Sequence, residues 1–193
     1  MKADSKTVIH TCMEEDPGYL FFDLGSQYYV AGRYTAFAGL IPVTGNVFHH
    51  AVEMFLKGAL AKTKPLSDLK KLGHNLPNIW KEFKAQANDQ ALDEFDRLIE
   101  KLNKFEDIRY PDKIMQEGMM ARIDITRAGM PVGSTPAVPE YNLCVEDIDQ
   151  LTEKIFEVGS RNPKVYLGKW NKPEAQEYLT RANSVFKFWR SRL

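Results

Sequence analysis

The chain has 193 residues, 26 Lys plus Arg, 26 Asp plus Glu, and 44% apolar residues. This length supports one domain with an ordinary hydrophobic core, and the composition excludes a wholly disordered protein. Nucleic-acid affinity depends mainly on neutralising phosphates, so zero formal net charge excludes a protein that is basic over its whole surface. A local basic patch remains open.

The two cysteines, Cys12 and Cys144, lie far apart in the sequence and no CxxC pair is present. They therefore indicate neither a disulfide framework nor a zinc site built from thiolates. Residues 1–6 lead into no apolar segment of the kind found in secretory signals. We expect a cytoplasmic protein, with residues 1–17 as an N-terminal tail.

The first predicted helix begins at Asp16-Pro17, because Asp is a favoured N-cap and proline is tolerated at the first helical position. It runs to about Ala38. Gly25 and Gly32 are seven residues apart, so they share a helix face on which another backbone can approach closely. We expect tight helix packing on this face, including the interface of a homodimer.

Residues 19–41 are nearly long enough to span a bilayer, but polar and charged side chains interrupt them, namely Asp23, Ser26, Gln27 and Arg33. Such side chains are costly in hydrocarbon. The pattern therefore favours a buried or interface helix, and we expect no membrane partner.

Residues 39–45 contain Pro42 and predict a break before a second helix over residues 46–62. At about 100° per residue, the apolar side chains of this helix gather on one face and a polar stripe lies on the other. The stripe consists of Asn46, His49, His50, Glu53 and Lys57. The last two are four residues apart, as in a favourable helical ion pair.

Three further helical segments are predicted before residue 110: a short turn over 66–72, a helix that opens at 74–77 with His74 or Asn75 near its cap, and a helix over 89–108. The last of these places its apolar residues on one stripe. Four helices with short connections are typical of an antiparallel bundle.

After residue 113 the pattern changes. Residues 119–127 alternate weakly as in a strand, and the glycines and prolines of residues 129–139 favour a linker or flexible flap. Two more helices are predicted, over 145–158 with a cap near Asn142 and over 172–189. The expected organisation is a helical bundle at 18–117, a flap or linker at 118–140 and a C-terminal helical extension at 141–193.

Three segments occur in an order and spacing that resembles the HEPN family (higher eukaryotes and prokaryotes nucleotide-binding domain): residues 47–57, Gly73-His74-Asn75-Leu76 and Arg109-Tyr110-Pro111-Asp112. The resemblance covers about residues 18–117. It implies an all-α, antiparallel bundle, usually dimeric, whose central helices line a polar cleft. The expected fold class is therefore an all-α HEPN-like bundle with a C-terminal helical extension and a short strand-like flap.

Members of this family include metal-independent ribonucleases of toxin–antitoxin and antiviral systems, partners of a minimal nucleotidyltransferase, and proteins that bind nucleotides. The ribonucleases share an Arg-x4-6-His motif near the start of the last bundle helix. This chain departs from it, because the residues at those distances after Arg109 are Ile114, Met115 and Gln116. The expected general acid or base is missing, which puts nuclease activity in doubt.

The candidate ligand-binding residues are His49, His50, Glu53, Lys57, Arg109, Tyr110 and Asp112. Imidazoles and an arginine fork suit phosphate. A metal site needs three or four ligands, and the predicted helix 46–62 offers at most two or three. With no signature for a further ligand, we predict no metal and no cofactor.

The alternative interpretation of the stripe is a hydrogen-bond network between helices or a solvated face. His74 is then a cap or an interhelix hydrogen-bond residue, Tyr110 packs on the bundle, and Arg109 and Asp112 tie down a turn.

Our leading hypothesis is a non-catalytic binding module that recognises a nucleotide, RNA or a partner protein through the polar cleft. The first alternative is a divergent metal-independent ribonuclease that recruits His49, His50 or His74 beside Arg109. The second is a purely structural dimerisation domain, for which the small-residue face of the first helix is the main sequence feature.

Overall fold

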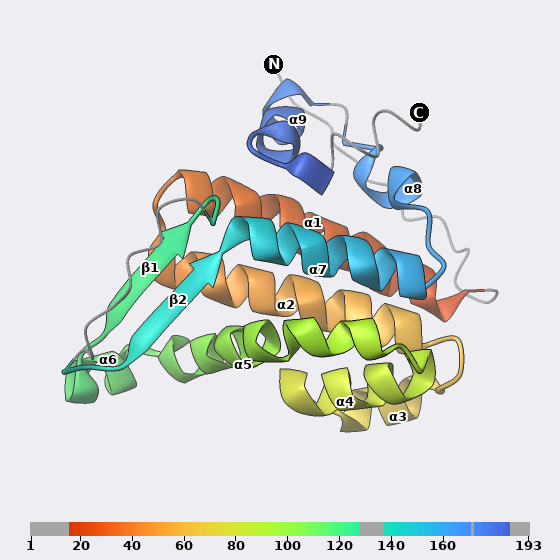
Figure 1. Cartoon of the computed structure of the whole chain (residues 1–193), viewed down its shortest axis with the longest axis horizontal. Helices are drawn as coiled ribbons and strands as arrows, with labels where there is room; N and C mark the ends of the chain where they lie inside the picture. The colour runs from red at the N-terminus through yellow and green to blue at the C-terminus, as the bar shows by residue number, and fades with distance from the viewer. Residues whose placement is uncertain (1–15, 128–136, 171, 186–193) are drawn as a thin grey trace, which may run out of the picture.

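The computed structural model describes residues 16–127, 137–170 and 172–185. These residues form a mainly helical protein with one small two-stranded sheet at one end (Figure 1). The prediction of a mainly helical fold is confirmed. Most of the predicted tail, the middle of the predicted flap and the end of the last predicted helix lie outside the described residues.

Helices α1 (Pro17–Phe37) and α2 (Ile41–Leu60) form a long antiparallel pair in the middle of the molecule (Figure 1). Asp16 caps α1 as predicted, since its carboxylate accepts a hydrogen bond from the backbone N–H of Gly18 at 3.1 Å. The predicted break over residues 39–45 is too long. Pro42 lies in the first turn of α2, where its missing N–H is tolerated, so the helix begins five residues earlier than 46.

The small-residue face of α1 packs against α2 of the same chain. A Cβ atom on Gly25 would lie 2.7 Å from the ring of Phe55, and one on Gly32 would lie 2.7 Å from the ring of Phe48. The prediction of close packing is confirmed, but the expectation that this face forms a dimer interface is wrong. The two phenylalanine rings already occupy the space that a second copy would need.

The second layer of the bundle follows α2 and contains α3 (Leu66–Lys71), α4 (Leu76–Ala87), α5 (Asp96–Lys104) and α6 (Pro111–Glu117). The predicted helix over 89–108 is not one continuous α-helix, because 3-10 turns at Gln90–Phe95 and Phe105–Ile108 flank α5. Its predicted apolar stripe is nevertheless buried in full: Leu92, Phe95, Leu98, Ile99, Leu102 and Phe105.

The sheet consists of β1 (Met120–Asp124) and β2 (Glu140–Cys144), which run parallel with Ile123 opposite Leu143. The strand-like pattern of residues 119–127 is confirmed by β1. The predicted helix cap near Asn142 is wrong, because Asn142 lies within β2 and Cys144 is the N-cap of α7 (Val145–Val158). The buried side chains of β2 face the core, and five residues are too few to distinguish a strand from a helix start.

The C-terminal extension contains α7, α8 (Pro163–Leu167) and α9 (Pro173–Thr180). Helix α7 matches the prediction, whereas α8 was not predicted and α9 ends well before residue 189. The chain leaves the helical conformation at Arg181, and Ala182 adopts a positive φ of 50°. In Figure 1, α8 and α9 lie above α1 and α7.

A buried ion pair holds this extension to the bundle. Arg33 on α1 donates from Nη1 to both carboxylate oxygens of Asp149 on α7, at 2.6 and 2.5 Å, and from Nε to the carbonyl oxygen of Tyr178 on α9 at 2.6 Å. Its Nη2 also donates to the carbonyl oxygen of Arg181. Tyr29 donates its hydroxyl proton to Asp149 at 2.5 Å. One buried guanidinium therefore joins α1, α7 and α9.

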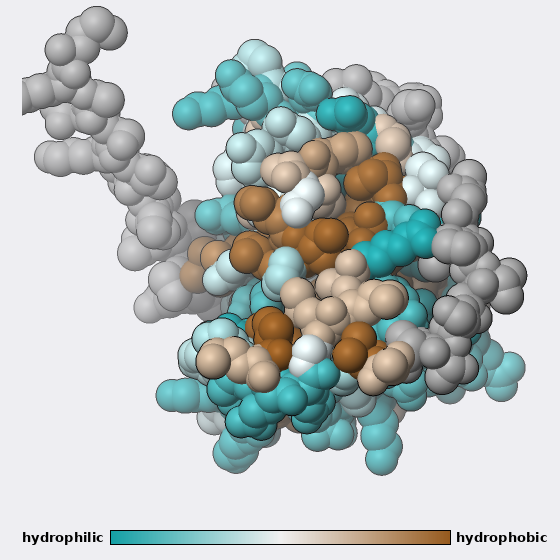
Figure 2. All heavy atoms as spheres, turned by 90° about the vertical axis from the view of Figure 1, so that its left-hand side faces the viewer, coloured by the Kyte–Doolittle hydropathy of each residue, from teal (hydrophilic) through white to brown (hydrophobic). Residues whose placement is uncertain are grey.

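Figure 2 views the sheet end of the molecule and shows apolar side chains gathered on that face. Exposed large apolar residues come from the α1–α2 turn, the start of α2, α6 and β1, namely Leu40, Val43, Met115 and Met120. The core therefore reaches the surface at the sheet end. Among the described residues, the helices are all too short or too polar to cross a membrane.

We predict that Gly32→Leu lowers the free energy of unfolding by about 3 kcal/mol, because the new side chain collides with Phe48 and overpacks the α1–α2 contact. Urea unfolding followed by circular dichroism measures this change. Ala31→Leu, on the exposed side of the same helix, is the matched control and should leave stability nearly unchanged. If Gly32→Leu instead folds well and has half the mass of wild type in solution, the small-residue face of α1 is a dimer interface after all.

Candidate functional site

The polar stripe of α2 points into the molecule, toward the loop between α3 and α4. Its centre is Glu53, whose side chain is fully buried. The Lys57 ammonium donates to Glu53 Oε1 at 2.7 Å. The His74 imidazole donates from Nδ1 to the same carboxylate, 3.0 Å from Oε2, and His50 Nδ1 lies 3.6 Å from Oε2. One carboxylate thus gathers a lysine and two imidazoles.

Two members of the stripe hold the backbone of the α3–α4 loop. Lys57 donates a second hydrogen bond to the carbonyl oxygen of Gly73 at 2.6 Å. His49 Nε2 lies 3.1 Å from the carbonyl oxygen of His74, and its Nδ1 lies 3.3 Å from that of Leu102 on α5. His49 is fully buried, and burial lowers its pKa. His49 thus lies between the loop and α5, and its neutral imidazole, with a single N–H, can donate to one of these two carbonyl oxygens at a time.

The site changes from buried to open over a short distance. The side chain of Glu53 is 0% exposed, that of His50 is 23% exposed and that of His74 is 63% exposed. Burial acts to raise the pKa of Glu53, but hydrogen bonds from His50, Lys57 and His74 outweigh burial and hold its pKa at about 2. The carboxylate therefore stays ionised at neutral pH beneath two imidazoles that reach solvent.

The interhelix hydrogen bond predicted as one role for His74 is confirmed. Asn75, not His74, is the N-cap of α4, and its side chain accepts from the backbone N–H of Asn78 at 2.9 Å. Gly73 adopts a left-handed φ of 61°, which ends α3 and turns the chain so that His74 meets Glu53.

Among the described residues, Glu106 connects Arg109 to the stripe. One carboxylate oxygen of Glu106 lies 3.6 Å from His49 Nε2, and the other lies 3.6 Å from the Arg109 guanidinium. Tyr110 is exposed, and the guanidinium carbon of Arg109 lies over its ring, 5.9 Å from the ring centroid. Asp112 is also exposed, in the first turn of α6. The ion pair of Arg109 that the structure shows is therefore with Glu106 and not with Asp112.

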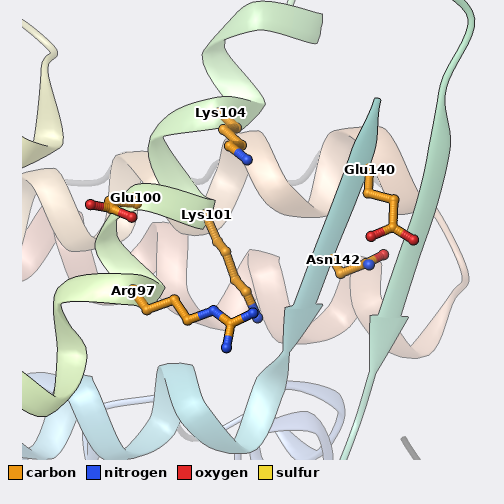
Figure 3. Close-up of a pocket in the computed structure, with 6 residues that line it drawn as sticks. All are labelled: Arg97, Glu100, Lys101, Lys104, Glu140 and Asn142. Carbon is orange, nitrogen blue, oxygen red and sulfur yellow. The ribbon is translucent and has the colours of Figure 1, made fainter. Parts of the chain in front are cut away.

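A second polar site lies between α5 and β2, in a groove of about 300 Å³. Its lining residues are Arg97, Glu100, Lys101, Lys104, Glu140 and Asn142. Figure 3 shows the three basic side chains projecting from α5 toward β2, whereas Glu100 points away from the groove. We call this site the α5–β2 groove.

The α5–β2 groove continues into a second hollow of about 250 Å³, and both are lined by Arg97 and Lys101. The basic side chain that the second hollow adds, Arg127, is paired with Asp147 at 2.5 Å. By contrast, the structure shows no ion pair between a described carboxylate and Arg97, Lys101 or Lys104. Three cations on one helix face are thus available to an anionic ligand.

The groove residues were missed by sequence reasoning, which considered only the apolar stripe of this helix. Positions 97, 101 and 104 have the i, i+4, i+7 spacing of a single helix face, so this signal was present. The sequence pattern did not reveal the opposite wall of the groove, because β2 was not predicted as a strand.

Comparisons with protein-family models, with curated proteins and with solved structures find no match for this chain. The HEPN resemblance therefore stays a prediction from the sequence, and the site is interpreted from its own geometry.

We predict that Glu53→Gln costs about 3 kcal/mol of folding free energy at pH 7, because it leaves the buried Lys57 ammonium without its carboxylate. The folded pKa of Glu53 lies below the ordinary value of 4.5, so its contribution is complete above pH 4.5 and is lost as pH falls toward 2. The difference between wild type and variant in urea unfolding should therefore shrink between pH 7 and pH 3.

Glu82→Gln is the matched control, since Glu82 makes a partly exposed ion pair with Lys64 at 2.8 Å. Exposed pairs contribute little, so this variant should be nearly as stable as wild type at both pH values. An equal loss of stability in the two variants would contradict the central role of Glu53.

Proposed function

We propose that this protein is a non-catalytic, cytoplasmic binding module for a phosphate-bearing ligand, a nucleotide or a short single-stranded RNA, which it holds in the α5–β2 groove. The observation that carries the proposal is the convergence of Arg97, Lys101 and Lys104 on that groove with no described carboxylate paired to them. An arginine fork binds phosphate oxygens in pairs, and lysines add mobile point charges.

The proposal keeps the ligand class that the HEPN resemblance implies and moves its site. The polar stripe of α2 is a poor place for a phosphate, because Glu53 is ionised at its centre and Lys57 is already bound to Glu53 and to the carbonyl oxygen of Gly73. The α5–β2 groove carries more positive than negative side chains. Its edge residue Asn142 offers an amide that can donate to or accept from a base or sugar.

The ribonuclease alternative requires a different arrangement of side chains. It needs an imidazole beside the cation that holds the phosphate, yet the described histidines belong to α2 and the α3–α4 loop and none lines the α5–β2 groove. We therefore expect RNA to bind and to remain intact.

A homodimer is part of the same proposal, with an interface other than the small-residue face of α1. The mass of the protein in solution tests it.

We predict that Lys101→Glu weakens binding of a labelled single-stranded RNA about tenfold, measured by fluorescence anisotropy at low salt, because it reverses the charge in the middle of the groove. With about three phosphates neutralised, the logarithm of the wild-type affinity should fall with the logarithm of salt concentration with a slope of about −2.

Lys81→Glu is the matched control. It makes the same change of net charge on the exposed surface of α4, away from the residues that line the groove. If both substitutions weaken RNA binding equally, the effect comes from net charge alone, and the proposal that RNA binds in the α5–β2 groove is refuted. No binding of RNA at micromolar concentration and of nucleotides at millimolar concentration would refute the proposed ligand class, and RNA cleavage would favour the ribonuclease.

A further inference from the structure

We propose that His50, Glu53 and His74 form a binding site for a divalent transition metal ion of the Zn²⁺ class. This inference is independent of the α5–β2 groove, since the two sites share no residue. It also revises the sequence expectation of no metal, because the ligand that the predicted helix 46–62 could not supply comes from the α3–α4 loop.

The three side chains present one ligand atom each toward a common point, and all three atoms lie within 4.8 Å of one another. A tetrahedral Zn²⁺ with bonds of about 2.0–2.1 Å places its ligand atoms about 3.3 Å apart. The observed separations from Glu53 Oε2 are 3.0 Å to His74 Nδ1 and 3.6 Å to His50 Nδ1, on either side of that value. The third separation, between the ligand nitrogens of His50 and His74, is at most 4.8 Å, so the two imidazoles would approach each other when the ion binds.

The chemistry of the ligand set fits a borderline metal ion. Two imidazole nitrogens and one carboxylate oxygen are typical ligands of Zn²⁺ and its neighbours in the first transition series, whereas Ca²⁺ and Mg²⁺ prefer oxygen alone. Three protein ligands leave one tetrahedral position, and the site is open enough for water to reach it, since the His74 side chain is 63% exposed. A water molecule would complete the coordination.

The surroundings hold these ligands in place. Lys57 donates to Glu53 Oε1, and His74 Nδ1 lies between the two carboxylate oxygens, 3.1 Å from Oε1 and 3.0 Å from Oε2. Oε2 is also the oxygen that lies 3.6 Å from His50 Nδ1. Lys57 and His49 also bind the carbonyl oxygens of Gly73 and His74, so the loop that carries His74 is fixed to α2 at two points.

The His50 ring is packed against Tyr28 of α1, with ring centroids 5.5 Å apart. Outer contacts of this kind orient metal ligands and are a regular part of metal sites.

This arrangement gives four residues of the polar stripe of α2 a role: His49, His50, Glu53 and Lys57. In the absence of metal, Glu53 accepts a hydrogen bond from His74 Nδ1, and a bound cation would replace that proton. The positive charge of Lys57 opposes a metal ion, but it is directed at the other carboxylate oxygen and is shared with a backbone carbonyl.

The experiment is a titration of the full chain, first stripped of metal with a chelator, with Zn²⁺ by isothermal calorimetry. We expect one Zn²⁺ per chain, and an affinity that falls at least a hundredfold in His74→Ala. The largely exposed His74 side chain makes this variant safe for folding, which circular dichroism verifies. Titration with Co²⁺ then reports four-coordinate geometry through the intensity of its visible absorption.

His10→Ala is the matched control for the loss of an imidazole, because His10 is not one of the proposed ligands. It should bind Zn²⁺ as wild type does, and Zn²⁺ should raise the melting temperature of wild type and His10→Ala but not of His74→Ala. The proposal is overturned if wild type does not bind Zn²⁺ at micromolar concentration, if His74→Ala binds as tightly as wild type, or if His10→Ala also loses the ion.

Discussion

The structure depends on the burial of α2, which has buried residues on both its apolar and its polar face. Its apolar face receives α1, and the centre of its polar stripe cannot reach bulk water, because Glu53 and His49 are fully buried. Buried polar groups have to find partners within the molecule. The partners are the α3–α4 loop and the end of α5, so the same contacts that satisfy α2 also fix where the second layer of the bundle packs.

A second buried charge has the same effect on the other side of the molecule. The Arg33 guanidinium is satisfied by Asp149 and by carbonyl oxygens of residues 178 and 181, so the C-terminal extension completes the environment of α1. Removing one partner of such a pair leaves an uncompensated charge and is strongly destabilising. The bundle and the extension are therefore parts of one core, although a sequence division at residue 141 separates them.

The two polar sites have opposite electrostatic character, which is why different ligands are proposed for them. The site formed by His50, Glu53 and His74 is organised around an ionised carboxylate and offers imidazole nitrogens, a combination suited to a cation. The α5–β2 groove presents three cations and suits an anion. Neither site is visible in one segment alone, because His74 and β2 come from parts of the chain remote from the helices they complete.

The sequence by itself determined the helical class, the Asp16 cap, the limits of α7 and the apolar stripes, because these depend on local periodicity and capping chemistry. It also identified the polar stripe as unusual. Only the tertiary structure decided that Gly32 packs within the chain, that β2 pairs with β1, and that His74 meets Glu53. These are contacts between segments distant in sequence, and local patterns carry no information on which buried surfaces will meet.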